Sequence, residues 1–469
     1  MVDSMGILIS ALPFAVAAVG LAGLGWPASG AGAAALATAV LGAVVWPELE
    51  ATAVPGALLG GLGTSAQVLY VLFGGLLLYN LLSTGGAVEA VSRFLGRLEP
   101  DRVALAAGVV VGVAPFFESV TGFGVAVVIS APILLAAGFT PLRAAVLATW
   151  GQCAVPWGAL GVGTVIGAHL AGMDFGRLSD ASAFLSLPLF PVYGVAAVAL
   201  AGGWTGVRRR GAEAIVLGLV AGAATIVTSL YLVPELAGAV GGLAATAVFL
   251  ARRRHRLSGV PVRALVPYAF LLALLAVANG IGDLRSLLEQ LGPVFDGPGL
   301  PLLISGVFAA LLLGLGGDAA GAAVRRTATQ WIPTAAAVLT FVLAGEVVAE
   351  SGAAGLLAGG AEALGVFFPA VSPVLAALGG ALTGSNAASN ALFMPLQVEA
   401  ARGLDVSEEL TAAVQNVAGS HASMLAPQRM VLAATATGLL GREGDILRAA
   451  VAPVAVSIGV LALLGMFLD

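Results

Sequence analysis

The chain has 469 residues, of which 59% are hydrophobic and 10% are charged, with a formal net charge of −5 and a mean hydropathy of +1.04. A soluble protein carries about 25% charged residues, so the composition excludes an ordinary soluble domain. Apolar runs of roughly 18 or more residues recur from end to end, which predicts an all-α polytopic membrane protein in a lipid bilayer.

Charged and proline-rich breaks between the apolar runs predict about 12 transmembrane helices. They are expected near residues 5–25, 31–47, 55–82, 144–172, 183–203, 213–232, 234–251, 264–281, 298–317, 331–350, 411–440 and 449–468. Two more apolar segments, 103–137 and 370–402, are interrupted by small polar residues. Irregular backbone at membrane depth must face protein or a water-filled cavity, so these two segments are expected to be re-entrant hairpins.

Arginine clusters at 208–210, 252–256 and 325–326 recur two predicted spans apart. Cytoplasmic loops of membrane proteins are enriched in arginine. The clusters are therefore expected on one cytoplasmic side, with both termini on the other side.

The two halves of the chain also resemble each other. FFESVTGFG (116–124) and TGSNAASNALF (383–393) hold matching places, and a broken-looking apolar span follows each. An odd number of spans separates the two hairpins, which predicts an inverted-topology repeat. The alternative is that helices rich in glycine and alanine align by chance. The predicted organisation within a single membrane unit is a first repeat, connecting transmembrane helices and a second repeat core, at 1–207, 208–330 and 331–469.

Glu118 stands at the predicted tip of the first hairpin. An ionised carboxylate at membrane depth costs at least roughly 2.5 kcal/mol, so this side chain should be paired, hydrated or protonated. Desolvation favours the protonated form, which makes Glu118 the candidate proton-coupling site. The alternative is a structural role in which the carboxylate accepts hydrogen bonds from backbone groups freed at the hairpin tip.

Small residues at both tips are the candidate substrate-binding groups. Glycine permits positive φ and a close approach of the backbone to a ligand. Asparagines spaced by four residues can cap a half-helix or direct their amides into a cavity, and half-helix N-termini favour anionic solutes. The alternative is that these residues only pack helices together. The candidates at the tips are Gly122, Phe123, Gly124, Ser385, Asn386, Ser389 and Asn390.

The broken spans that follow the hairpins carry further polar residues close to prolines: Gln152 in the first half, and Ser420, His421, Gln428 and Arg429 in the second. These are candidate substrate contacts. Glutamine and serine next to a proline can equally satisfy the carbonyl that the proline leaves free. Arg429 either pairs with a substrate carboxylate or extends toward the cytoplasm.

Other chemistry finds little support in the sequence. One cysteine excludes a disulfide within the chain and any multi-thiolate metal site, and no HExxH, CxxC or P-loop pattern is present. No metal, cofactor, nucleic acid or enzymatic activity is therefore expected. His169 is expected to be incidental and Glu346 to be a helix-packing polar group, with a second proton site as the alternative for Glu346.

The motifs FFESVTGFG, TGSNAASNALF and APQRMVLAATATGLLGREGDI (426–446) together resemble the L-lactate permease family. The resemblance implies a proton-coupled carrier of lactate or glycolate in the cytoplasmic membrane, built from inverted repeats with paired hairpins. It also implies a small carboxylate and a proton as the transported partners, and it suggests a homodimer. It assigns Glu118 and the following glycines to the first family motif and the doubled Ser-Asn pairs to the second.

Two departures from the family pattern concern the site. Ser119 and Val120 replace the usual Gly and Ala after the motif glutamate, and Arg429 replaces the last serine of a usual Ser-Pro-Gln-Ser. These changes put lactate itself in doubt more than they do carboxylate transport. The hypotheses are therefore a symporter of a small 2-hydroxy monocarboxylate, a symporter of another small organic anion, an uncoupled carboxylate facilitator, and an intramembrane hydrolase using Ser420 and His421.

Overall fold

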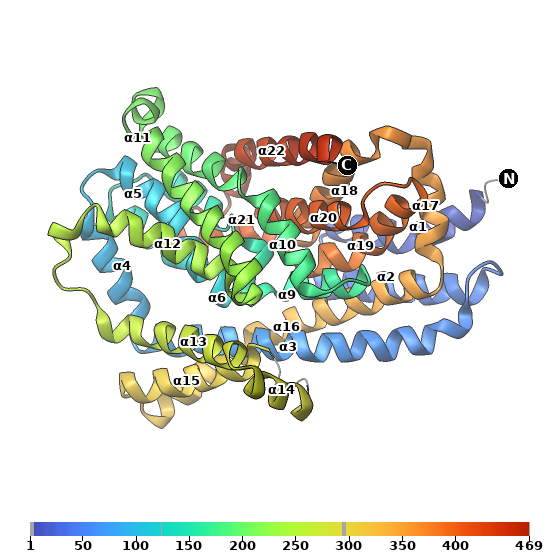
Figure 1. Cartoon of the computed structure of the whole chain (residues 1–469), viewed down its shortest axis with the longest axis horizontal. Helices are drawn as coiled ribbons and strands as arrows, with labels where there is room; N and C mark the ends of the chain where they lie inside the picture. The colour runs from blue at the N-terminus through green and yellow to red at the C-terminus, as the bar shows by residue number, and fades with distance from the viewer. Residues whose placement is uncertain (1–3, 123, 293–296, 469) are drawn as a thin grey trace.

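A computed structural model describes residues 4–122, 124–292 and 297–468 of the chain, and all the regular secondary structure in these ranges is helical (Figure 1). The expected all-α polytopic architecture is confirmed. Ten of the described helices are long and apolar enough to cross a membrane, or eleven if one bent pair is counted as a single span. The ten include the first arm of each hairpin, and by length and composition the total is close to the roughly 12 spans that the sequence predicts.

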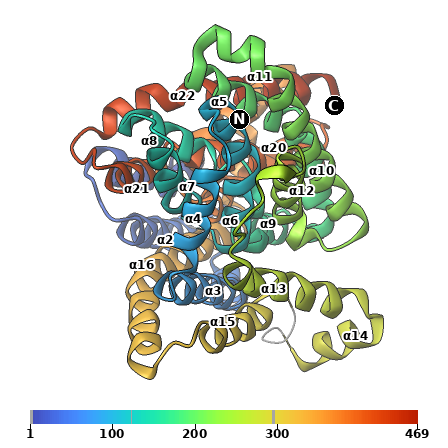
Figure 2. The same ribbon diagram turned by 90° about the vertical axis from the view of Figure 1, so that its left-hand side faces the viewer.

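One layer of the molecule consists of long helices that flank the hairpins. It contains α3, α13, α14, α15 and α16, which lie together below the other helices in both views (Figures 1 and 2). Their bounds are Val54–Thr84, Val262–Gly280, Gly282–Leu291, Gly299–Leu313 and Gly317–Glu350. Helix α3 packs along both α15 and α16. We call this set the flanking layer.

The N-terminal pair joins the flanking layer to the rest of the protein. Helix α1, Ser4–Ala18, continues into a π-helical turn, Val19–Gly23, and α2, Ala28–Val45, packs on both α1 and α16. Helix α4, Ala87–Leu98, follows α3 and leads into the first hairpin.

The first hairpin begins with one continuous helical arm made of α5, a π-helical turn and α6, at Arg102–Gly108, Val109–Val113 and Ala114–Thr121. Asp101 caps this arm, because its carboxylate accepts the N–H of Val103 at 3.0 Å. Every residue from 103 to 121 is buried, so the arm contacts protein on all sides. The chain returns in the shorter α7, Val125–Ala136.

A broken helix follows this hairpin, as predicted. Helix α8, Pro141–Trp150, and the stretch containing α9, Gly158–Leu170, are bent by 65° relative to each other. Three successive residues beyond the break, at 159–161 at the start of α9, have left-handed backbone angles. Non-glycine residues rarely adopt such angles, so the start of α9 has a specific local conformation.

The connecting helices are α10, α11 and α12, at Phe175–Ser186, Leu189–Tyr231 and Ala237–Ala251. The two spans predicted at 183–203 and 213–232 are both found in α11, which is interrupted at Gly203 with φ 61° and ψ −156°. The two halves pack against each other, because a Cβ on Gly218 would lie 2.5 Å from the backbone nitrogen of Pro191. Gly203 therefore reverses the chain between two crossings.

The second half repeats the order of a hairpin followed by a broken helix. Its helices are α17, α18, α19, α20, α21 and α22, at Ala353–Ala361, Phe368–Thr383, Asn386–Gly403, Glu408–Ser423, Pro427–Thr437 and Glu443–Leu468. In Figure 1 the chain enters α5 at the left-hand end and α18 at the right-hand end. The hairpins thus approach each other from opposite ends, as an inverted repeat requires. The domain boundaries at 207 and 330 stay a prediction.

The arginine-rich loop between α12 and α13 lies at the left-hand end of Figure 1, whereas both termini lie toward the right-hand end. This one arginine cluster and the termini therefore lie toward opposite ends of the molecule, and which end is cytoplasmic stays a prediction.

Candidate functional site

The tip of the first hairpin is shaped by glycine and capped by Glu118. Gly122 has φ 72° and ψ −161°, a conformation that side chains exclude, and its N–H donates to the Glu118 carbonyl at 2.7 Å. The Glu118 carboxylate accepts the N–H of Gly124 at 3.1 Å and that of Ala126 at 3.2 Å. Glu118 is 1% exposed and caps the N-terminus of α7. The structural role considered for Glu118 is therefore present. Phe123 lies outside the described residues.

Arg429 reaches this tip from the other half of the chain. It stands in the first turn of α21, and its Nη1 lies 3.6 Å from Glu118 Oε1. A Cβ on Gly124 would lie 2.6 Å from the same Nη1, so the arginine passes close to the backbone of this residue, whose φ of 78° favours glycine. The Arg429 side chain is 11% exposed. It is directed to the hairpin tips rather than to the cytoplasm.

The tip of the second hairpin turns at Gly384, whose φ is 63°. Ser385 caps α19, because its hydroxyl accepts the N–H of Ala388 at 3.4 Å. Gln428 Nε2 donates to the carbonyl of Thr383, and Arg429 Nε donates to that of Gly384 at 3.3 Å. Side chains at the start of α21 thereby satisfy carbonyls that the end of α18 leaves without helical partners.

The two asparagines of the doubled Ser-Asn pair converge on a third. Asn416 Oδ1 accepts the side-chain N–H groups of Asn386 at 2.8 Å and Asn390 at 2.9 Å. Asn416 Nδ2 donates to the hydroxyls of Thr164 at 3.0 Å and Ser182 at 2.9 Å. This network joins α19, α20, α9 and α10 behind the second tip. Buried networks of this kind fix one arrangement of helices when their members are satisfied.

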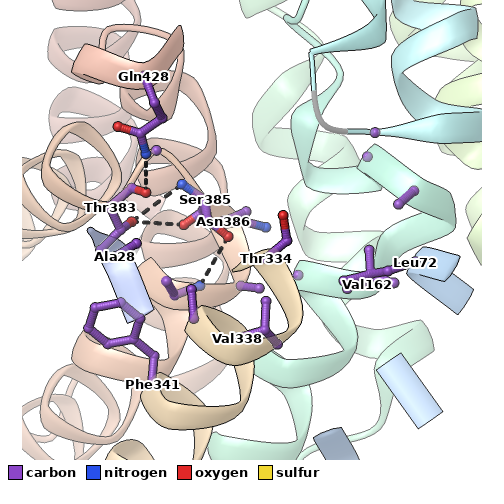
Figure 3. A pocket seen from close by; sticks show the side chains of 18 of the residues that line it. Ala28, Leu72, Val162, Thr334, Val338, Phe341, Thr383, Ser385, Asn386 and Gln428 are labelled. Carbon is purple, nitrogen blue, oxygen red and sulfur yellow. Dashed lines mark hydrogen bonds between the residues drawn. The ribbon is translucent and has the colours of Figure 1, made fainter. Parts of the chain in front are cut away.

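A pocket of about 430 Å³ lies between the two tips. Figure 3 shows its second-hairpin side, where Thr383, Ser385 and Asn386 face Thr334, Val338 and Phe341 of α16. The first hairpin contributes Glu118 and Gly122, α9 contributes Val162 and Gly163, and α21 contributes Gln428 and Arg429. Glu118 and Arg429 are the two ionisable side chains among the described residues that line it.

Two polar atoms at the pocket have no hydrogen-bond partner among the described residues. They are Asn386 Oδ1, an acceptor, and Arg429 Nη1, a donor, and both are buried. Buried polar atoms are nearly always satisfied in folded proteins, so each unsatisfied one calls for an explanation. A ligand with a carboxylate and a hydroxyl group supplies the missing acceptor and the missing donor.

The structure brings together one subset of the predicted site residues. Those lining the pocket are Glu118, Gly122, Ser385, Asn386, Gln428 and Arg429, and Gly124 packs beside Arg429. The others lie behind the lining: Gln152, Ser389, Asn390, Ser420 and His421. Gln152 Nε2 donates to the carbonyl of Thr149 at 3.1 Å, a bond within its own turn of the chain. Asn390 Nδ2 donates to the carbonyl of Gly163 at 2.9 Å.

Ser420 and His421 do not form a nucleophile–base pair in this structure. The Ser420 hydroxyl has no hydrogen-bond partner among the described residues, and His421 Nδ1 lies 2.8 Å from the hydroxyl of Tyr193. Their side chains are neighbours in sequence and therefore point about 100° apart on α20.

Part of the pocket lining was not anticipated. Thr334, Val338 and Phe341 come from α16, and Ala28 comes from the start of α2. These are ordinary residues of apolar spans, and only Pro333 next to Thr334 offered a local signal. Thr164 was also missed, because a single threonine in an apolar helix usually bonds its own helix backbone.

Comparison with known proteins now adds the family. The L-lactate permease family model matches residues 6–295 and 291–468. The chain belongs to this family. The apolar helices and the family model together assign the chain to the multi-pass membrane transport proteins.

Curated relatives in the family are distant but cover most of the chain. An L-lactate permease of Streptococcus iniae is 26% identical over 72% of this chain and 79% of its own length. The glycolate permease GlcA of Escherichia coli is 27% identical over 81% of this chain and 80% of its own length. An L-lactate permease of Salmonella typhimurium is 26% identical, again over 81% and 80%.

Among solved structures, the YdaH transporter of Alcanivorax borkumensis, described as having an unusual topology, superposes with a TM-score of 0.45 at 20% identity. The match covers 89% of this chain and 87% of that protein.

Proposed function

We propose that this family member is a proton-coupled symporter of a small 2-hydroxy monocarboxylate, such as L-lactate or glycolate, in the cytoplasmic membrane. The observation that carries the proposal is the pocket between the two hairpin tips, with Glu118 and Arg429 in its lining. The volume of about 430 Å³ falls in the range of about 300–1,000 Å³ used for small molecules. The names of the curated relatives, L-lactate and glycolate permeases, support the same substrate class.

The chemistry of the pocket supports a hydroxy acid. Arg429 Nη1 offers a charged donor to a carboxylate, and Asn386 Oδ1 offers an acceptor to a hydroxyl group. Glu118 supplies one titratable group at membrane depth, where the ionised form is costly without partners. Protonation and release at this carboxylate would couple proton movement to that of the substrate.

The decisive experiment uses the purified full chain in proteoliposomes with labelled L-lactate and glycolate. A symporter accumulates substrate when the outside is made acidic, and it also exchanges label against unlabelled substrate without a pH gradient. We expect Glu118→Gln to retain exchange, because the amide oxygen still accepts one backbone N–H. The variant should lose pH-driven accumulation, because the amide cannot bind and release a proton as the carboxylate does. Glu118 is not the coupling site if this variant accumulates substrate as well as the unchanged protein does.

A matched control is Glu409→Gln, which removes an exposed carboxylate that pairs with Arg177 far from the pocket. It should accumulate substrate normally. Exchange without any pH-driven accumulation in the unchanged protein would favour an uncoupled facilitator. Accumulation of other carboxylates in preference to lactate and glycolate would favour a symporter of a different small organic anion.

A further inference from the structure

Arg429 is a buried cation whose bonding is incomplete. Its guanidinium carries five N–H donors. The described contacts are a hydrogen bond from Nε to the carbonyl of Gly384 and a 3.6 Å approach of Nη1 to Glu118 Oε1, which is longer than a hydrogen bond. Nη1 itself has no hydrogen-bond partner among the described residues. A buried charge held this loosely is costly, so the site is built for a further negative group.

Glu118 fills that role only as an ion pair at 3.6 Å, without a hydrogen bond to Arg429. Its two carboxylate oxygens are each engaged by a backbone N–H at the start of α7, at 3.1 and 3.2 Å. The carboxylate is therefore anchored to its own hairpin, and Arg429 is left facing the pocket from α21. A carboxylate entering the pocket would find the planar donor fork of Arg429, which suits carboxylates in bidentate geometry.

The pocket lining holds no charged side chain besides Glu118 and Arg429 among the described residues. Helix α6, which carries Glu118, packs against α3, α7, α9 and α12. The titratable side chains described on those helices are Tyr70 and Tyr79 on α3 and His169 on α9, and none of them lines the pocket. The charge of the site is thus set by Glu118, Arg429 and whatever the pocket holds.

The possible charge states of the site can be compared directly. With Glu118 ionised and the pocket empty, one negative and one positive side chain sum to zero. Adding a monocarboxylate alone leaves one net negative charge, and adding a proton alone leaves one net positive charge. Adding both restores zero. An uncompensated charge at membrane depth costs several kcal/mol, so the two neutral states are the ones favoured to cross.

We propose that Arg429 binds the substrate carboxylate and makes that binding depend on protonation of Glu118, so that one proton enters with each monocarboxylate and the loaded site is neutral. This inference rests on the proposed function and names the residue that enforces coupling. When the substrate binds, a proton from bulk water adds to a carboxylate oxygen of Glu118. No covalent bond to carbon changes, and Arg429 keeps its charge throughout. The substrate takes the place of Glu118 as the counter-ion of Arg429.

The test measures proton uptake on binding as well as transport. In detergent and weak buffer, addition of L-lactate or glycolate to the full chain should remove about one proton from solution per molecule bound. Arg429→Gln should raise the apparent substrate KM at least about tenfold, because a charge-assisted bidentate contact contributes more binding free energy than a neutral hydrogen bond. The same variant should abolish the linked proton uptake. Arg429→Lys keeps the charge, so proton uptake should persist with a smaller rise in KM.

A second readout is the response to membrane potential. The unchanged protein should transport at the same rate with and without an imposed potential. In Glu118→Gln the empty site carries one positive charge and the loaded site none, so any net uptake should become faster with the inside positive. Arg177→Gln, which removes an exposed arginine of the Arg177–Glu409 pair, is the matched control and should behave as the unchanged protein.

Each outcome decides between the two proposals. Normal KM and normal proton uptake in Arg429→Gln, with a folded protein by size exclusion, overturn the role of Arg429 and leave the proposed function standing. A Glu118→Gln variant whose uptake ignores the potential also overturns the charge-balance argument. If the unchanged protein neither binds nor exchanges any of the labelled carboxylates, both proposals fail together.

Discussion

His169 Nε2 lies 2.7 Å from Glu346 Oε1, and this pair links α9, next to the hairpins, to α16 of the flanking layer. The histidine side chain is 44% exposed and the glutamate side chain 8%. The sequence had suggested that His169 was incidental. The two partners should therefore differ in how much their loss destabilises the protein. His169→Ala should lower the free energy of unfolding by about 3 kcal/mol, because it leaves a buried carboxylate without its partner. Glu346→Gln should cost about 1 kcal/mol, because the half-exposed imidazole can be hydrated.

Thermal unfolding of both variants in detergent at neutral pH checks this order. Equal losses, or a greater loss for Glu346→Gln, would mean that Glu346 does not depend on His169 for its charge. His255→Ala is the control, since it removes an exposed histidine at the opposite, arginine-rich end.

Gly122 should tolerate no side chain. Its backbone angles are open to glycine alone, and a Cβ there would lie 2.8 Å from the Cβ of Ala159. Gly122→Ala is expected to abolish substrate exchange and to lower stability by at least about 2 kcal/mol.

Gly86→Ala is the control, because Gly86 has the same φ of 72° but no atom within 4 Å of its Cβ position. It should cost about 1 kcal/mol and keep exchange. Similar exchange in both variants would show that the tip adapts to the methyl group.

The positions of both hairpins and of the broken helices could be predicted from the sequence, because glycine, serine and asparagine interrupt apolar runs at Gly122 and Gly384. The contact between Arg429 and Glu118 could not. It depends on where the span 411–440 breaks and on the direction in which α21 leaves the break, and neither is a local property. Asn386 and Asn390 share one helix face by spacing, but depth along α19 decides that the first lines the pocket and the second contacts Gly163.

The ion pairs of Asp101 should make stability depend on pH in the acidic range. Burial raises the pKa of Asp101, but hydrogen bonds from Arg210 and from the N–H of Val103, with the charges of Arg210 and Arg209, outweigh it and hold the pKa below its usual value. A lowered pKa in the folded state contributes stability above the unfolded value of about 3.9, and this is lost as pH falls through the folded value.

Asp101→Asn should therefore lower the free energy of unfolding by up to about 1 kcal/mol near neutral pH. Asparagine still caps α5, so the change isolates the charge. The difference from the unchanged protein should shrink below about pH 4. Asp174→Asn is the control, because Asp174 caps α10 by accepting the N–H of Arg177 and forms no ion pair among the described residues. A difference that persists undiminished at pH 3 would show that the arginines do not stabilise the ionised form.

Asn386 should determine whether the pocket prefers a hydroxy acid. Asn386 lines the pocket, its Nδ2 is held by Asn416, and its Oδ1 is buried without a hydrogen-bond partner among the described residues. A buried acceptor that meets a substrate hydroxyl favours lactate over propionate, which lacks that group. Asn386→Ala should reduce this preference by about tenfold, equivalent to about 1.4 kcal/mol, mainly through weaker binding of lactate.

The measurement for Asn386→Ala is competition of unlabelled lactate and propionate against labelled lactate exchange. Asn279→Ala, which removes an amide bonded to its own helix α13, should leave the ratio unchanged. If Asn386→Ala keeps the full preference for lactate, then another group recognises the hydroxyl and Asn386 serves only the asparagine network behind the second tip.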